Sequence, residues 1–353
     1  MLSLNFNQSC MTCRHPSAGF ADPENGKDSI NFPVSIGSDE MSFGGRNAPS
    51  SAYAGFSPVL ENVNGTWTGG MFWDGRATGW TLDDPLAKQA QGPFENPVEM
   101  GIDRETVVDR VATSSYAPLF LQVYPDTDFS DIDGTYNNIA RAIAAFERSS
   151  AVTKFYSKFD RFWQACEERG IAVSEINTTT NLSTLPQGIL SIRQLQGLAL
   201  FNDPGKGNCA ACRNRQFRRC RWYRISPSFY RPYLRQPWHT NQLEAARIGG
   251  RCASRLRSWW ISGVTRNCWI RIGIRQVQGP DPAQHRQISP YGHNGYFATL
   301  EDIVHFCNTR DVADWPLPEY ADTMSTDLGN LGLSDDEERS IVAFMKSLTD
   351  DSK

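Results

Sequence analysis

Four of the nine cysteines in this chain form two pairs with C-x-x-C spacing: Cys10 with Cys13, and Cys209 with Cys212. Such a pair serves as half of a zinc site, as a thiol redox couple, or as the attachment point of haem c. In that last use two thioethers hold the macrocycle and the following His ligates the iron. The spacing alone leaves these three chemistries open. Nine cysteines in 353 residues are too few for a disulfide scaffold.

The residues around both pairs favour haem attachment. The first pair lies in CMTCRHPSAGFADP (10–23), and the second ends LALFNDPGKGNCAAC (198–212). Both resemble the two haem sites of the bacterial di-haem cytochrome c peroxidase family, which includes the methylamine-utilisation, or MauG-type, enzymes. Further motifs follow in the family's order: GGRNAPS at 44–50, MFWDGRATG at 71–79, QAQGPFENPVEMG at 89–101 and SPYGHNGYFATLEDIVHFCNTRD at 289–311.

This resemblance implies two haem c groups with separate duties. Cys10 and Cys13 would hold a haem that reacts with hydrogen peroxide, whereas Cys209 and Cys212 would hold a haem that transfers electrons.

The same resemblance makes three residues catalytic candidates. Glu99 stands at the position of the distal acid/base, which takes a proton from one peroxide oxygen and delivers it to the other. Gln89 would hydrogen-bond in that pocket. Trp73 stands where the family has a tryptophan between the haems, and an oxidisable indole there can relay electrons. Without the resemblance these residues are equally consistent with a helix cap, a surface amide and a buried aromatic.

Four more residues are candidates for metal or haem contacts. Asn47 stands where the family has a calcium ligand, and its carbonyl oxygen suits that ion. His293 stands beside the second haem, and Cys307 stands at its distal axial position. A thiolate at 307 can ligate iron, although an ordinary buried thiol is an equal alternative. His15 is a weak iron-ligand candidate, because a shift of one residue turns its ring away from the iron.

Both family iron ligands are replaced. Arg14 and Arg213 stand where the family has His, and a guanidinium stays protonated and cannot donate to iron. From residue 213 to 287 there are 16 Arg, no Lys and two acids, a net charge of +14, which leaves −18 for the rest of a chain whose total is −4. Five of the ten tryptophans also lie there.

A shifted reading frame explains this stretch. Reading the codons of 276–286 one base later permits KFKVPTLRN, and the same shift of 228–242 permits PFTDLTYDNLGIPTN, two signatures of the family. We therefore interpret 213–287 as frameshifted and expect it to be poorly packed, because burying so many Arg against two acids leaves unpaired charges.

Helices are expected to position the candidate residues. Apolar residues recur at helical spacing after a capping Asp103 and in three further segments, 137–150, 155–170 and 189–198. Ser334 and Glu337 form a capping box for a last helix. Strand signals are scarce. The sequence therefore predicts a mainly α protein made of two cytochrome c-like helical domains with long loops and few strands.

The repeated layout predicts the domain limits. Residues 1–176 would form the N-terminal, peroxidatic domain, which looks truncated at its start. The polar run 177–187 would be the linker, and 188–353 the C-terminal, electron-transfer domain with 213–287 aberrant. The written chain shows no signal peptide and no apolar run long enough for a membrane span. The resemblance nevertheless implies a periplasmic protein.

The leading functional interpretation is a di-haem cytochrome c peroxidase-like oxidoreductase that reduces hydrogen peroxide with electrons from a small cytochrome c or cupredoxin. A sister interpretation is MauG-type oxidation of a partner protein's side chain, which Cys307 in place of Met favours. A third is an inactive frameshifted product that lacks both proximal His residues. A homodimer is compatible with each.

Two interpretations come from other classes. An Arg-rich nucleic-acid binder would use the basic stretch with its interleaved Trp, but the absence of Lys and the shifted-frame signatures argue against it, and we expect no nucleic-acid partner. A zinc protein could join the two pairs in one four-cysteine site. The haem-family motifs in the rest of the chain make that interpretation remote.

Overall fold

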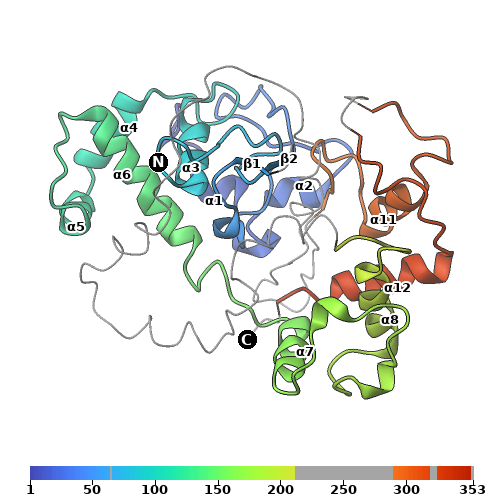
Figure 1. Cartoon of the computed structure of the whole chain (residues 1–353). Helices are drawn as coiled ribbons and strands as arrows, with labels where there is room; N and C mark the ends of the chain where they lie inside the picture. Colours follow the sequence, from blue (N-terminus) through green and yellow to red (C-terminus); the bar gives the residue numbers. More distant parts are fainter. Residues whose placement is uncertain (64–65, 211–288, 319–323, 351–353) are drawn as a thin grey trace.

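The computed structural model describes residues 1–63, 66–210, 289–318 and 324–350 (Figure 1). Our interpretation of 213–287, and Cys212 as a haem-attachment residue, lie outside these residues. The helices and strands in chain order are α1 (Cys10–Cys13), η1 (Pro16–Ala18), α2 (Pro23–Lys27), η2 (Ala54–Phe56), β1 (Glu61–Val63), β2 (Thr66–Thr68), α3 (Pro85–Glu95), α4 (Arg104–Ala112), α5 (Ala117–Val123), α6 (Ile132–Glu147), α7 (Lys158–Glu167), η3 (Val173–Glu175), η4 (Leu182–Thr184), α8 (Ile192–Asn202), α11 (Leu300–Thr309) and α12 (Asp335–Lys346).

Helices joined by long loops dominate the described part of the chain, which confirms the predicted mainly α class with few strands. Its one sheet is the antiparallel pair β1 and β2. Asp103 caps α4 by accepting from the backbone N–H of Thr106, and Ser334 and Glu337 form the predicted capping box of α12. None of the helices within these residues is long and apolar enough to cross a membrane.

The first group of helices packs around α3 and α6 (Figure 1). Asp84 caps α3, because its carboxylate accepts from the backbone N–H groups of Leu86 and Ala87. Arg148, just after α6, donates two hydrogen bonds of 2.8 and 2.7 Å to the same carboxylate. This paired contact ties the end of α6 to the start of α3, and apolar side chains from both helices fill the core between them.

The second group consists of α7, α8, α11 and α12 (Figure 1). Helices α8 and α12 cross most closely at Gly197, where an added Cβ would lie 1.9 Å from the carbonyl oxygen of Ser340. Only a glycine permits this approach. The contact fixes α8, which leads directly to the second cysteine pair.

Residues before, within and after the predicted linker contribute to the second core. Phe159 and Phe162 of α7 pack in the second core, whereas Val152 still packs against Phe20 of the first half. Leu185, inside the predicted linker, is also buried in the second core. The aromatic stripe of α7 therefore packs with the helices that follow it in the chain. The domain limits as a whole stay a prediction.

Tyr53 joins the first group of helices to the segment before α7 and to the C-terminal residues. Its hydroxyl donates to the carboxylate of Asp350, which is buried and also accepts from the backbone N–H of Tyr156 at 2.9 Å. The Tyr53 ring packs edge-on against Phe155, with ring centroids 5.0 Å apart. The first half, the connecting segment and the C-terminus are thus joined at one point.

Candidate functional site

The first cysteine pair lies on α1, a single helical turn. Cys10 and Cys13 are not joined in a disulfide, and the Cys10 side chain is exposed. The pKa of the Cys13 thiol is raised to about 11, first by burial and then by the nearby Asp22 carboxylate. The pKa of Cys10 is also raised. The largest cause is the loss of hydration near the protein, and the second is the negative charge of the Glu147 carboxylate.

The loop 35–44 connects this pair to Glu99. The Ser35 hydroxyl lies close to the Cys13 thiol and lowers its pKa, but the larger effect of burial still leaves that pKa raised. The Ser38 N–H donates to the Glu99 carbonyl oxygen at 2.7 Å, and the Glu99 carboxylate adds to the raised pKa of Cys13. The Glu99 carboxylate itself accepts from Asn96 Nδ2 at 2.6 Å. Glu99 therefore lies on the same side of the fold as the first cysteine pair.

Gln89 lies on α3, the helix that ends just before the Glu99 loop. Its side chain is buried, and its amide makes no hydrogen bond within the part of the chain that the structure describes. The backbone N–H of Met100 donates to Pro93, which folds the Glu99 loop back onto α3. Gln89 and Glu99 are thereby held on the same short unit of structure, with an amide available to a bound molecule.

Three predicted site residues from distant parts of the sequence meet between the two halves. Trp73 Nε1 donates to the Asn47 carbonyl oxygen at 2.8 Å, and the Asn47 N–H donates to the His293 carbonyl oxygen at 2.9 Å. The Trp73 and His293 rings are in edge contact, with centroids 6.4 Å apart. At Gly295, with φ of +68°, an added Cβ would lie 2.5 Å from the Pro33 carbonyl oxygen. The sequence therefore permits a close approach of the halves here.

The Asn47 side chain contributes to this junction as a donor. Its Nδ2 donates to the Pro33 carbonyl oxygen at 2.9 Å and lies 3.5 Å from Asn25 Oδ1. Across the described ranges, no group of three or more His, Cys, Asp and Glu is arranged to hold a metal ion. The assignment of Asn47 to calcium stays a prediction.

Cys209 is buried at the end of the α8 unit. Its thiol donates to the Gly207 carbonyl oxygen at 3.2 Å, and Ala210 donates to Phe201 at 3.0 Å. Lys206 pairs with Glu337 of α12 at 2.9 Å, which holds the turn before Cys209 against the second core. The structure therefore fixes one thiol of the second pair.

Cys307 lies in the last turn of α11 and is buried in the second core, the same cluster that contains Cys209. Its place in that core fits both interpretations made from the sequence, so iron ligation stays a prediction.

His15 caps the turn η1. Its Nδ1 accepts from the Ser17 N–H at 3.2 Å and lies 2.6 Å from the Ser17 hydroxyl. His15 thus already has a local structural role, and iron ligation by it stays a prediction.

The residues at the first pair fit haem attachment but not iron ligation. The two thiols have C-x-x-C spacing on one helical turn, and exposed apolar side chains lie on α1 and on the adjoining loop: Met11, Ile36, Met41 and Phe43. Gln8 Nε2 donates to the Ile36 carbonyl oxygen at 2.8 Å, which holds that loop near α1. An apolar macrocycle would cover these surfaces. Arg14, however, offers no lone pair to a metal.

Glu147 is a residue of this site that the sequence reading missed. It is only 9% exposed at the end of α6; the Ser51 hydroxyl donates to its Oε1 at 2.7 Å, and its Oε2 has no recorded partner among the described residues. Burial raises the pKa of this carboxyl, against the opposing effects of the Ser51 hydrogen bond and the Arg14 charge. A charged residue on the inward stripe of Tyr136, Ala140 and Ala144 was the available signal.

Replacing Glu147 by Gln should stabilise the protein at neutral pH. The folded-state pKa is raised above the unfolded value, so the stability that the protonated carboxyl contributes is present below that value and is lost as the pH rises through the folded-state pKa. Glu147→Gln cannot ionise, and we expect its unfolding free energy to exceed the parent's by about 1 kcal/mol at pH 7 and to match it near pH 4.

Urea unfolding at the two pH values measures this difference. Glu167→Gln is the matched control, because Glu167 is also the last residue of its helix but is exposed. Equal pH dependence of the parent and Glu147→Gln would show that the carboxyl ionises freely.

Comparisons with known proteins agree with this geometry. Residues 1–168 match the family model described as di-haem cytochrome c peroxidase. The methylamine utilization protein MauG of Paracoccus denitrificans is 28% identical over 99% of this chain and 85% of its own length. The cytochrome c551 peroxidase of Nitrosomonas europaea is 26% identical over 97% of this chain and 74% of its own length.

Solved structures show the same fold. The diheme peroxidase BthA from Burkholderia thailandensis matches with a TM-score of 0.61 and 23% identity, covering 99% of this chain and 83% of that one. A MauG-like protein associated with microbial copper homeostasis matches with a TM-score of 0.55 and 22% identity. The chain belongs to the family of di-haem cytochrome c peroxidases and MauG proteins.

Proposed function

We propose that this chain derives from an enzyme that reduces hydrogen peroxide with electrons from a small cytochrome c or cupredoxin. The observation that carries this proposal is the junction of Trp73, Asn47 and His293. An indole that is held by a hydrogen bond and touches both halves can pass electrons from one half to the other. Such a junction suits a protein in which one half meets the oxidant and the other receives electrons from a donor.

Glu99 is proposed to move the proton of the reaction. Haem c, held by the thioethers, would supply the electrons that the peroxide bond consumes. The Glu99 carboxylate takes the proton from one peroxide oxygen and returns it to the other, so that water can leave. Asn96 Nδ2, which donates to this carboxylate at 2.6 Å, orients it, and the buried amide of Gln89 lies on the same unit to hold the peroxide.

The written chain itself should lack this activity, because Arg14 and Arg213 stand at the positions of the iron ligands. The direct test uses the protein with both His residues and the original frame restored. Peroxide consumption that requires a reduced small cytochrome supports the proposal. A periplasmic location, as the family resemblance implies, is part of it.

A second candidate is oxidation of a side chain on a partner protein, as in the MauG-type enzymes. Two features support it: the family resemblance puts Cys307 at the distal axial position in place of Met, and a protein named MauG is 28% identical over nearly the whole chain. Mass spectrometry of an added protein substrate separates the two. Peroxide-dependent oxidation of that substrate, with no consumption of a cytochrome donor, would favour the second candidate.

Replacing Trp73 by Phe tests the electron-relay role. The change removes one hydrogen bond to Asn47, so we expect the unfolding free energy to fall by only about 1 kcal/mol. Donor-dependent turnover of the restored protein should fall much further than this stability loss explains. The control is Trp80→Phe, because the Trp80 indole also donates to a backbone carbonyl, that of Leu60, at 2.7 Å. Equal turnover of the two variants would argue against a relay through Trp73.

A further inference from the structure

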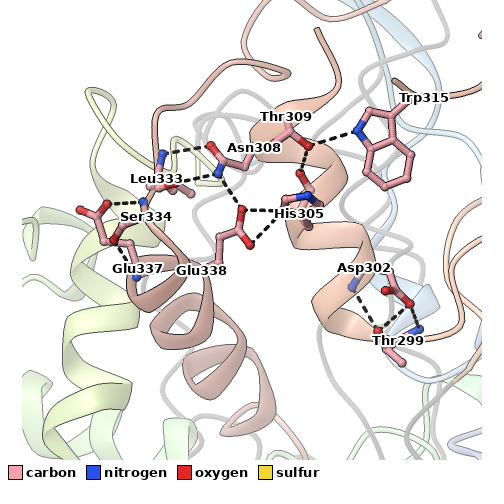
Figure 2. A network of polar contacts seen from close by, with 10 residues as sticks. All are labelled: Thr299, Asp302, His305, Asn308, Thr309, Trp315, Leu333, Ser334, Glu337 and Glu338. Carbon is pink, nitrogen blue, oxygen red and sulfur yellow. Dashed lines mark hydrogen bonds and ion pairs between the residues drawn. The ribbon is translucent and has the colours of Figure 1, made fainter. Parts of the chain in front are cut away.

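The last turn of α11 is held by a polar clamp centred on Asn308 (Figure 2). The Asn308 side chain is only 5% exposed and makes three hydrogen bonds. Its Nδ2 donates to the Leu333 carbonyl oxygen at 2.9 Å and to Glu338 Oε1 at 2.6 Å, and its Oδ1 accepts from the Leu333 N–H at 3.0 Å. One amide thus joins α11 to the start of α12 and to the loop before it.

Glu338 binds α11 at a second point. Its two carboxylate oxygens lie 3.1 and 3.2 Å from Nδ1 of His305, which is one turn before Asn308 (Figure 2). On the other side of the turn, Trp315 Nε1 donates to Thr309 Oγ1 at 3.1 Å. Side-chain contacts therefore hold the helix at His305 and at Thr309, on either side of Cys307.

Backbone bonds complete the clamp. The Gly329 N–H donates to the Cys307 carbonyl oxygen at 2.8 Å, and the Leu331 N–H donates to the Asn308 carbonyl oxygen at 3.1 Å. The end of α11 is thus capped by the returning loop. Because the direction of a Cβ follows from the helix backbone, fixing the rotation of this turn also fixes the Cα–Cβ bond of Cys307, from which the thiol extends.

We propose that Asn308 is a positioning residue that sets the direction of the Cys307 thiol within the second core. A buried amide with all its bonds made contributes little more net stability than an apolar residue of the same shape, but it specifies one arrangement of the turn. The direction of the thiol does not depend on the proposed function. Only its consequence, that position 307 faces the second haem, rests on that function.

Thiol labelling of the full chain tests the proposal. Cys166 of α7 is a fully buried thiol in the same core and serves as an internal reference, because global loosening raises the labelling of both thiols. We measure the rates of maleimide labelling of Cys307 and Cys166 by peptide mass spectrometry. In Asn308→Asp the ratio of these rates should rise about tenfold, since the carboxylate cannot donate to Leu333 or Glu338.

Three variants keep the test decisive if Asn308→Asp folds poorly. Asn308→Leu fills the same space without the clamp and should also raise the ratio. Glu338→Gln keeps an oxygen that can accept from Asn308 and should leave the ratio near the parent's. Thr299→Ala removes the cap at the opposite end of α11, where Thr299 bonds Asp302, and should loosen the helix without changing the ratio. A ratio unchanged in both Asn308 variants would overturn the proposal.

A spectroscopic readout separates this inference from the proposed function. In the protein with restored iron ligands, Asn308→Asp should change the absorption spectrum of the second haem, whereas Thr299→Ala should not. If the labelling ratio rises but the spectrum does not change, Asn308 positions the thiol as proposed, and the assignment of position 307 to the haem is wrong.

Discussion

Expressed with haem c attachment machinery and a supplied export signal, the chain as written should carry little or no haem with a ligated iron. The thiols of the first pair are correctly spaced on one helical turn, but Arg14 follows them and remains protonated. Arg213 stands in the same position after the second pair. The expected lack of haem therefore results from the missing iron ligands and not from the thiols. Restoring each ligand should restore the haem at that cysteine pair.

The repairs should act stepwise. Arg14→His alone should restore one haem, at the first pair, and Arg14→His with the original frame after Cys212 should restore two. Mass spectrometry counts the covalent haem, and absorption spectra report its ligation. Arg14→Lys is the matched control, since it keeps the charge and offers no aromatic nitrogen. Two equivalents of correctly ligated haem in the unrepaired chain would show that the arginine assignments are mistaken.

In the repaired protein, replacing Glu99 by Gln should lower peroxide turnover by about two orders of magnitude or more, the range that general acid/base catalysis contributes. The glutamine keeps the shape of the side chain and an oxygen for the hydrogen bond from Asn96, but it cannot accept the peroxide proton. The melting temperature should change little, because the other two bonds of this residue, from the Ser38 N–H and to the Asn96 carbonyl oxygen, are made by its backbone.

The control for this experiment is Glu105→Gln, an exposed glutamate in the first turn of α4. It should leave both turnover and the melting temperature unchanged. Turnover of Glu99→Gln within a few-fold of the parent would mean that Glu99 is a structural residue and that the first pocket uses another proton carrier.

Local features of the chain were predictable from the sequence because they depend on residues at most a few positions apart. C-x-x-C spacing puts two thiols on one helical turn, and Asp103 and Ser334 each bond an N–H three residues later. These interactions form whatever the rest of the chain does. The order of the motifs likewise indicated the haem-protein family, and the helical spacing of apolar residues predicted the mainly α class.

Contacts between distant residues were decided by the tertiary structure alone. The meeting of Trp73 with His293 requires the two halves to approach within the space that Gly295 leaves open. The isolated Oε2 of Glu147 depends on how α6 packs, and no periodicity reports a missing partner.

The helices α7 and α11 illustrate the same limit. The apolar stripe of α7 was predictable from the sequence, but a stripe does not specify which core it faces, and α7 packs with the second core. Asn308 looked like an ordinary polar residue near a helix end, yet its three hydrogen bonds go to residues 25 and 30 positions away. The sequence thus determined which chemistry the chain carries, whereas long-range packing decided which side chains hold it in place, because burial and partners exist only once the helices have met.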